Sequence, residues 1–325
     1  RICAIAFDYA HQPVRDFRLA LIEEAIAQYD IDGVELDFLR HPLVFKPGAE
    51  RTHAHLMTEF IGRVRNALDR AGKERGKNLC LAVRTLVPLA AARRIGLDVD
   101  DWLEAGYIDQ WIGGIVDRNR LELRQAVDLG ERHNCAVYAS CKTDGILGRG
   151  HYSPEAFRAI AANHYRAGVQ GIYVFNMTAY RYRWLAGQTP PAGLGTDYDF
   201  RPLREIGSFD DIRYGDKHYI FDNKGSGHRT DIATFAEWSG QMQDRLLISE
   251  WGTALDKPVL PADLQQGESI EMMLRIADDP REAEAAGLKM DASLRLMATD
   301  MTGGSHVLSI TWNGSGLGAQ TLEGE

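Results

Sequence analysis

Two acidic residues, Glu35 and Asp37, lie within a short apolar segment of the sequence, Gly33–Phe38. If this segment forms a β-strand, residues two apart share one face, so both carboxyl groups point to the same side. Neighbouring carboxyl groups shift each other's pKa, and one can stay protonated while the other is ionised. Acid–base or nucleophilic catalysis on a glycosidic bond requires this arrangement. The alternative is a structural ion network, in which Arg84 and Arg40 neutralise the pair.

Further candidate residues follow the predicted strands, where a parallel barrel gathers its catalytic groups. If Asp37 is the nucleophile or base, Asp117 or Asp8 is expected to be the acid, at a carboxyl separation of about 5–9.5 Å. A second set offers hydrogen bonds to sugar hydroxyls or stacking on a pyranose face: Arg40, His41, Arg84, Trp111, Lys142, Asn176 and Tyr180, with Phe38. Each also has a structural interpretation, as a core ion pair, a packing residue or a solvated charge.

The elements that would position these residues alternate along residues 1–180. Apolar runs typical of strands are Ile2–Phe7, Gly33–Phe38, Leu79–Val83, Tyr107–Ile112, Ala136–Ala139 and Gly171–Phe175. Helical spacing of apolar residues separates them, at Phe17–Tyr29, Met57–Leu68, Val99–Leu103, Leu121–His133 and Ser153–Ala167. Strict alternation implies parallel strands with right-handed crossovers. No Gly-x-Gly-x-x-Gly follows a strand, which favours a TIM-type (βα)8 barrel, without its first βα units, over a dinucleotide-binding sheet.

The remainder of the chain has a different texture. Residues 181–256 read as an irregular extension or linker, and residues 257–325 as a β-rich C-terminal module. Polar and apolar residues alternate in Ser269–Ile276, Ala292–Met297 and His306–Trp312, and Asn313-Gly314 is a turn signal. These patterns predict a small β-sandwich.

The composition limits the classes of partner and cofactor. The 325 residues contain 37 Lys and Arg against 46 Asp and Glu, a net charge of −9, which disfavours nucleic acid and anionic membrane surfaces as partners. Four cysteines are too few for a disulfide scaffold. The sequence favours neither a secretion signal nor a membrane span, and it does not indicate an oligomeric state.

Three histidines, His41, His53 and His55, raise a third hypothesis, a barrel lyase or a metal-dependent hydrolase. Side chains two residues apart on a loop or helix start diverge, however, so His53 and His55 make a poor pair of ligands. The expectation is therefore that no metal and no cofactor is bound.

The N-terminal half resembles a known family. Phe7-Asp8-Tyr9, Pro13-Val14-Arg15 and the segment from Tyr29 to Pro42, with its core Asp32-Gly33-Val34-Glu35-Leu36-Asp37, resemble the glycosyl hydrolase-like family 10 group of bacterial TIM-barrel proteins. Residues 167–176 are similar to the last barrel strand of that group. The resemblance implies a glycoside hydrolase that acts on a poly- or oligosaccharide in a polar cleft, with a secreted or periplasmic location. It does not identify the glycan.

A comparison with chitinase-type barrels narrows the mechanism. Those proteins carry Asp-Gly-x-Asp-x-Asp-x-Glu on one strand, with the final Glu as general acid. Laid on this sequence, the acidic positions fall on Asp32, Glu35 and Asp37, and the final one on Leu39. Leucine cannot donate a proton, so the general acid is expected to come from another strand end.

Overall fold

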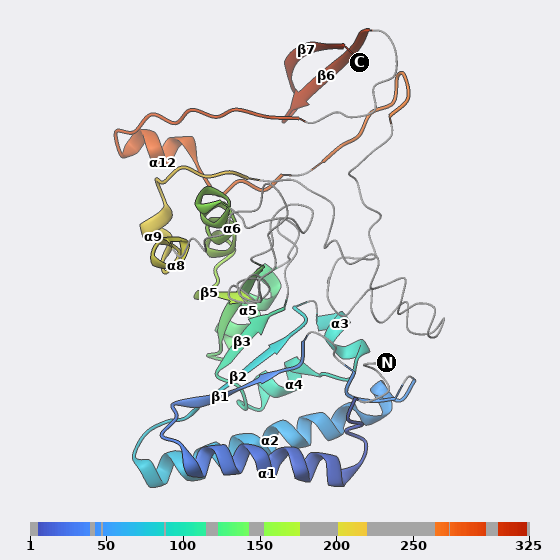
Figure 1. The fold of residues 1–325 in the computed structure, drawn as a ribbon, viewed down its shortest axis with the longest axis vertical. Coiled ribbons are helices and arrows are strands. Elements are labelled where there is room, and N and C mark those ends of the chain that lie inside the picture. The colour runs from blue at the N-terminus through green and yellow to red at the C-terminus, as the bar shows by residue number, and fades with distance from the viewer. Residues whose placement is uncertain are drawn as a thin grey trace, which may run out of the picture. The chain divides into compact units, whose positions relative to one another are not determined.

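The computed structural model describes residues 6–39, 43–46, 48–87, 89–114, 123–142, 153–175, 201–219, 264–272, 274–296 and 305–323. The chain forms two compact units, Arg1–Asp278 and Asp279–Glu325 (Figure 1). The sequence placed boundaries near residues 180 and 256. Both positions lie outside the described residues, so that division stays a prediction.

A parallel sheet organises the first unit. Its five strands are β1 (Gly33–Asp37), β2 (Cys80–Thr85), β3 (Gln110–Gly113), β4 (Ala136–Lys142) and β5 (Gly171–Phe175), and they are neighbours in chain order. Five of the six predicted strands, and their parallel direction, are thus confirmed. The other, Ile2–Phe7, is described only at its last two residues, which are not in a strand.

Helices follow the strands as the periodicity predicts. They are α1 (Gln12–Gln28), α2 (Glu50–Arg75), α3 (Leu89–Arg94), α4 (Val99–Glu104), α5 (Leu123–Arg132) and α6 (Pro154–Arg166), and the short α8 (Arg201–Glu205) and α9 (Phe209–Ile212) come later. α1 and α2 lie side by side (Figure 1). α6 begins as predicted, with Pro154 in its first turn and the Ser153 hydroxyl accepting from the Ala156 N–H at 3.3 Å. None of the described helices combines the length and apolar character needed to cross a membrane.

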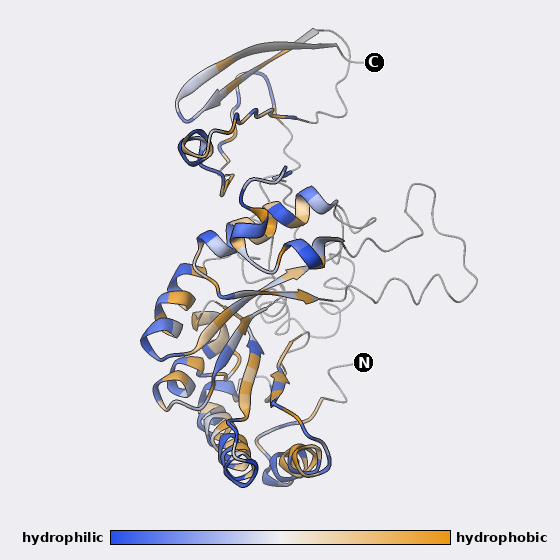
Figure 2. Ribbon diagram, turned by 90° about the vertical axis from the view of Figure 1, so that its left-hand side faces the viewer, coloured by the Kyte–Doolittle hydropathy of each residue, from blue (hydrophilic) through white to orange (hydrophobic). Residues whose placement is uncertain are grey.

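The two faces of the sheet have different surroundings. Leu81, Val83, Trp111 and Val137 are fully buried on one face, in a core completed by side chains of the helices. Figure 2 shows the helices along one side of the strands. Alternation along each strand turns the other set of side chains to the inner face, which includes Glu35, Asp37, Arg84 and Tyr173.

The sheet is strongly curled. β1 and β5 are its two edge strands, and in a flat sheet they would lie about 19 Å apart, four strand spacings of about 4.8 Å. The Tyr173 hydroxyl of β5 nevertheless donates to Glu35 Oε1 of β1 at 3.2 Å. The inner face is therefore concave, as in the wall of a barrel, and it brings together side chains that are 138 residues apart in sequence.

The second unit contains a short helix and a hairpin. The helix is α12 (Pro280–Ala285), and the antiparallel strands are β6 (Ser305–Trp312) and β7 (Ser315–Glu323), joined at Asn313-Gly314, both with positive φ. The predicted strand His306–Trp312 and its turn are confirmed.

Two other predicted C-terminal strands are wrong as far as they are described. The described residues of Ser269–Ile276 and Ala292–Met297 form no strand. Several of their apolar side chains, such as Met272 and Leu294, are exposed. Alternation indicates which side chains could share a face, but a strand also needs a neighbour for its backbone hydrogen bonds, and sequence alternation does not supply one.

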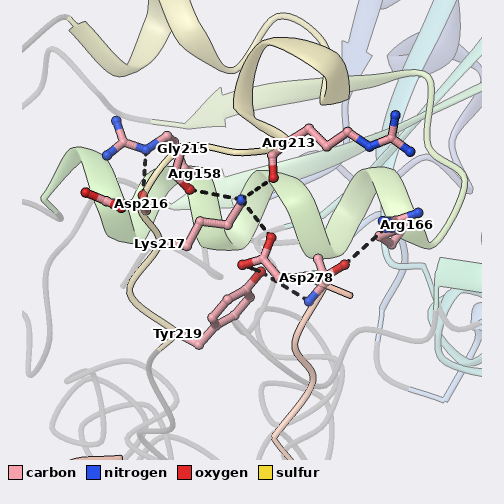
Figure 3. A network of polar contacts seen from close by, with 9 residues as sticks. Arg158, Arg166, Arg213, Gly215, Asp216, Lys217, Tyr219 and Asp278 are labelled. Carbon is pink, nitrogen blue, oxygen red and sulfur yellow. Dashed lines mark hydrogen bonds and ion pairs between the residues drawn. The ribbon is translucent and has the colours of Figure 1, made fainter. Parts of the chain in front are cut away.

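A buried polar network closes the first unit around Lys217 (Figure 3). The side chain of Lys217 is 2% exposed, and its ammonium donates to the carbonyls of Arg213 at 2.8 Å and Gly215 at 3.1 Å and to Asp278 Oδ1 at 2.7 Å. The Tyr219 hydroxyl donates to Asp278 Oδ2 at 3.1 Å. All three ammonium hydrogens of Lys217 have acceptors. Because Lys217 and Asp278 are far apart in sequence, their ion pair also links two distant segments of the chain.

Breaking this network is expected to destabilise the first unit. Lys217→Met keeps most of the side-chain volume but leaves the Asp278 carboxylate without its cation, which costs about 3 kcal/mol of unfolding free energy. Chemical denaturation measures the change. Arg70→Met, which removes only an exposed ion pair with Glu23, is the control and should change the free energy by less than about 1 kcal/mol. Equal changes in unfolding free energy for the two substitutions would contradict the stabilising role of the Lys217 network.

A buried histidine makes the stability of this unit depend on pH. His164 of α6 is 4% exposed, and burial lowers the pKa of its imidazole from 6.5 to about 4. Below about pH 6.5 the imidazole is protonated in the unfolded chain, whereas in the folded chain it stays neutral until about pH 4. The stabilising contribution is therefore complete above pH 6.5, and about 3 kcal/mol is lost as the pH falls to about 4.

The substitution His164→Gln tests this pH dependence. Glutamine does not titrate, so the unfolding free energy of the variant should fall less steeply between about pH 6.5 and 4 than that of the parent chain. Urea unfolding at several pH values gives the two slopes. His218→Gln, which replaces an exposed histidine, should keep the parent slope. A His164→Gln slope equal to the parent's would disprove the role of His164.

Candidate functional site

Strand β1 presents two carboxyl groups on the concave face of the sheet. Val34 and Leu36 alternate with Glu35 and Asp37, and both apolar residues pack against the core under the helices. That packing turns Glu35 and Asp37 to the opposite, inner face. Asp37 pairs in register with Arg84 of β2, so its guanidinium lies on the same face.

Asp37 is held in a fixed orientation but stays accessible. Arg84 Nε donates to Asp37 Oδ1 at 3.3 Å, and the Leu39 N–H donates to the same oxygen at 2.9 Å. The Arg84 side chain is completely buried, whereas that of Asp37 is 41% exposed. The carboxyl group thus has one oxygen engaged by two donors and a surface that a ligand can reach.

Glu35 is held from the far edge of the sheet. Tyr173 of β5 donates its hydroxyl proton to Glu35 Oε1 at 3.2 Å. The Arg84 guanidinium carbon lies 5.4 Å from the centroid of the Tyr173 ring, within the range of a cation–π contact. Glu35, Asp37, Arg84 and Tyr173 are named the inner-face cluster below.

The environment raises the pKa of both carboxyl groups. For Glu35, burial is the largest cause of the higher pKa and the charge of Asp37 adds to it, while the Tyr173 hydrogen bond and Arg84 oppose it. For Asp37, burial again raises the pKa, while Arg84 and the Leu39 N–H oppose the rise. A raised pKa lets a carboxyl group keep its proton to a higher pH, as a proton donor must.

Of the two predicted partner acids the structure describes only Asp8, whose contacts lie outside the inner-face cluster. Asp8 Oδ1 accepts from the Ala10 N–H at 3.0 Å, and Asp8 Oδ2 lies 3.7 Å from His11 and 3.9 Å from Lys46. These contacts belong to the loop before α1 and a nearby segment. Asp117 lies outside the described residues.

The predicted substrate-binding residues are only partly described. Arg84 belongs to the inner-face cluster. Lys142 occupies a β4 position on the same face, because it pairs with Phe175, two residues beyond Tyr173. Four others lie outside the described residues: Arg40, His41, Asn176 and Tyr180.

The stacking role predicted for Trp111 is wrong. Trp111 pairs in register with Val83, and both are completely buried under the helices. Its indole N–H donates to the Thr85 hydroxyl at 2.7 Å. Phe38 also packs on the core, with its ring centroid 5.8 Å from that of Trp102. A residue near a strand end is inward only if the alternation places it so, and Trp111 is on the outward phase.

Tyr173 is the member of the inner-face cluster that the sequence analysis missed. A signal was available, since alternation in the predicted strand Gly171–Phe175 places Tyr173 on one face with Gly171. The alternation does not say which face is inward. Whether Tyr173 reaches the other edge strand depends on the curl of the whole sheet.

The described residues offer no metal centre. Among them, no group of three or more His, Cys, Asp and Glu side chains could hold a metal ion. His53 and His55 both lie in α2, where residues two apart point in different directions, and the His53 ring packs 5.6 Å from that of Phe45. His41 lies outside the described residues.

Comparisons with known proteins leave the family open. No family model matches the chain, and no curated protein matches it. Solved structures do match. One is a glycoside hydrolase family 18 N-acetylglucosaminidase from Paenibacillus barengoltzii, with 12% identity and a TM-score of 0.39, covering 51% of this chain and 72% of that chain. A likeness of this size carries no argument about activity, so the function is inferred from the inner-face cluster.

Proposed function

We propose that the chain is a glycoside hydrolase that cleaves a poly- or oligosaccharide by carboxylate catalysis. One observation carries the proposal: Glu35 and Asp37 lie side by side on the concave face of a curled parallel sheet, both accessible and both with raised pKa values. Such a pair provides a proton donor and an anionic group within reach of one glycosidic bond.

Asp37 is proposed as the nucleophile or general base. Its Oδ1 is fixed by Arg84 and the Leu39 N–H, and the Arg84 charge favours the ionised form that either role requires. Glu35, Asp117 and Asp8 are the proposed sources of the acid. For Asp117 or Asp8, the role of general acid requires a carboxyl separation of about 5–9.5 Å from Asp37.

The proposed active site also needs a complete barrel and residues that hold the glycan. In a closed (βα)8 barrel, strands four positions apart face each other across about 15 Å, a gap that two inward side chains such as Glu35 and Tyr173 can bridge. We propose this closure for residues 1–180 and a small β-sandwich around the β6–β7 hairpin. The proposed sugar contacts come from Arg40, His41, Lys142, Asn176 and Tyr180.

A glycan-cleavage screen tests the proposal. The purified chain is incubated with neutral and acidic polysaccharides and with their oligosaccharides, and new reducing ends are counted over time. Cleavage of at least one glycan that persists in the presence of a metal chelator is expected. Binding without any cleavage across the panel would contradict it.

The second candidate function is a carbohydrate-binding barrel without catalysis. The contact that favours it is the ion pair between Asp37 and the completely buried Arg84, since a buried arginine needs a carboxylate whether or not chemistry occurs. In that case Asp37→Asn would lower stability but would not affect any cleavage, because the parent chain would cleave nothing.

A further inference from the structure

The contact between Glu35 and Tyr173 joins the two edges of the sheet. It is a hydrogen bond of 3.2 Å between side chains that share the inner face. The Tyr173 ring also lies 5.4 Å from the Arg84 guanidinium carbon, and Arg84 in turn binds Asp37. Tyr173 therefore contacts the Glu35 carboxyl directly through its hydroxyl. Its ring contacts Arg84, the residue that binds the Asp37 carboxyl.

We infer that Tyr173 is a positioning residue for Glu35: its hydroxyl fixes the Glu35 carboxyl, and its ring links that carboxyl to the Asp37–Arg84 ion pair. The inference rests on the proposed function, since positioning matters for catalysis only if Glu35 exchanges a proton during cleavage. It goes further by naming the residue that sets the geometry and the acidity of Glu35.

The charges around Glu35 determine the direction of the effect. In the described residues, Asp37 faces it from β1, Arg84 from β2 and Tyr173 from β5. Burial raises the pKa of Glu35, and the hydrogen bond from Tyr173 acts against that rise by stabilising the carboxylate. The pKa of Tyr173 is itself raised, first by burial and then by the charge of Glu35, so the phenol keeps its proton at neutral pH.

Titration of Glu35 in Tyr173→Phe tests the inference without any substrate. Phenylalanine keeps the ring beside Arg84 and removes only the hydroxyl, so the pKa of Glu35 should rise by about one unit. The side-chain carboxyl signal of ¹³C-labelled glutamate reports the pKa, and Glu35→Gln identifies the signal. An unchanged pKa in Tyr173→Phe would overturn the inference.

Tyr165→Phe is the matched control. The Tyr165 hydroxyl donates to the Ile206 carbonyl at 2.8 Å, so this variant also loses one tyrosine hydrogen bond within the same unit but outside the inner-face cluster. The pKa of Glu35 should stay at its parent value. An equal rise in both variants would overturn the inference, because the rise would then follow from a general loss of stability.

A measurement on the parent chain covers the case in which Tyr173→Phe does not fold. The Tyr173 ring carbon that bears the hydroxyl should change its ¹³C shift with the pKa of Glu35, because ionisation strengthens the hydrogen bond between them. A Tyr173 signal that stays constant while Glu35 titrates would overturn the inference.

Activity separates this inference from the proposed function. If Glu35 donates the proton, the alkaline limb of the kcat/KM profile should move upward by the same amount as the titrated pKa; if Glu35 accepts it, the acidic limb should move upward. A shifted Glu35 pKa in a chain that cleaves no glycan would refute the proposed function alone. Glycan cleavage with an unshifted Glu35 pKa would refute the inference alone.

Discussion

Replacing Asp37 by asparagine is expected to lower kcat for glycan cleavage by about a thousandfold or more. The amide is nearly isosteric, and its oxygen can still accept from Arg84 and the Leu39 N–H, the two donors that now hold Oδ1. It is neutral, however, and can act neither as the nucleophile nor as the base. Initial rates of reducing-end release measure the loss, and glycan binding by calorimetry should be largely retained.

Asp32→Asn is the matched control for that substitution. Asp32 lies just before the same strand, its side chain is 97% exposed, and it pairs with Lys77 at 3.0 Å. The same chemical change there should leave kcat within about twofold, because an exposed ion pair contributes little. Equal rates for Asp37→Asn and the parent chain would show that Asp37 is not a catalytic residue.

The second large effect is expected at Glu35. Glu35→Gln removes a titrating group with a raised pKa and should lower kcat by about 10²- to 10⁴-fold, the usual contribution of general acid–base catalysis. One limb of the kcat/KM profile should disappear as well, because the group that produces it no longer titrates. Initial rates, measured at every pH at which the variant stays folded, test both the lower kcat and the loss of that limb.

Glu24→Gln is the matched control for the Glu35 substitution. Glu24 is an exposed residue of α1 whose carboxylate accepts from Gln28 at 2.9 Å. This variant should keep both limbs of the profile and the parent rate. A Glu35→Gln profile that coincides with that of Glu24→Gln would refute the proton-exchange role of Glu35.

Local patterns were sufficient to predict most of the sheet and one edge of the site. The alternation in Gly33–Phe38 predicted that Glu35 and Asp37 share a face, because backbone geometry alone determines it. Arg84 directly follows the predicted strand Leu79–Val83, and the parallel register places it beside Asp37. These features depend on short stretches of chain and on one pairing.

The features that were missed depend on longer-range structure. The contact of Tyr173 with Glu35 requires the sheet to curl, and that curl depends on the twist and stagger of all five paired strands. Trp111 was assigned from its place near a strand end, but its register with Val83 turns it to the core. In the C-terminal part, alternation in Ser269–Ile276 could not reveal that no neighbouring strand pairs with the described residues.

Chemical rescue of Asp37→Gly tests the catalytic assignment most directly. This variant removes the carboxyl group and opens a space that azide or formate can enter, so a small anion can replace the missing nucleophile or base. With a glycan that the parent chain cleaves, the account predicts very slow cleavage by the variant alone and an increase of about tenfold or more when the anion is added. Cleavage at the parent rate without any added anion would contradict it.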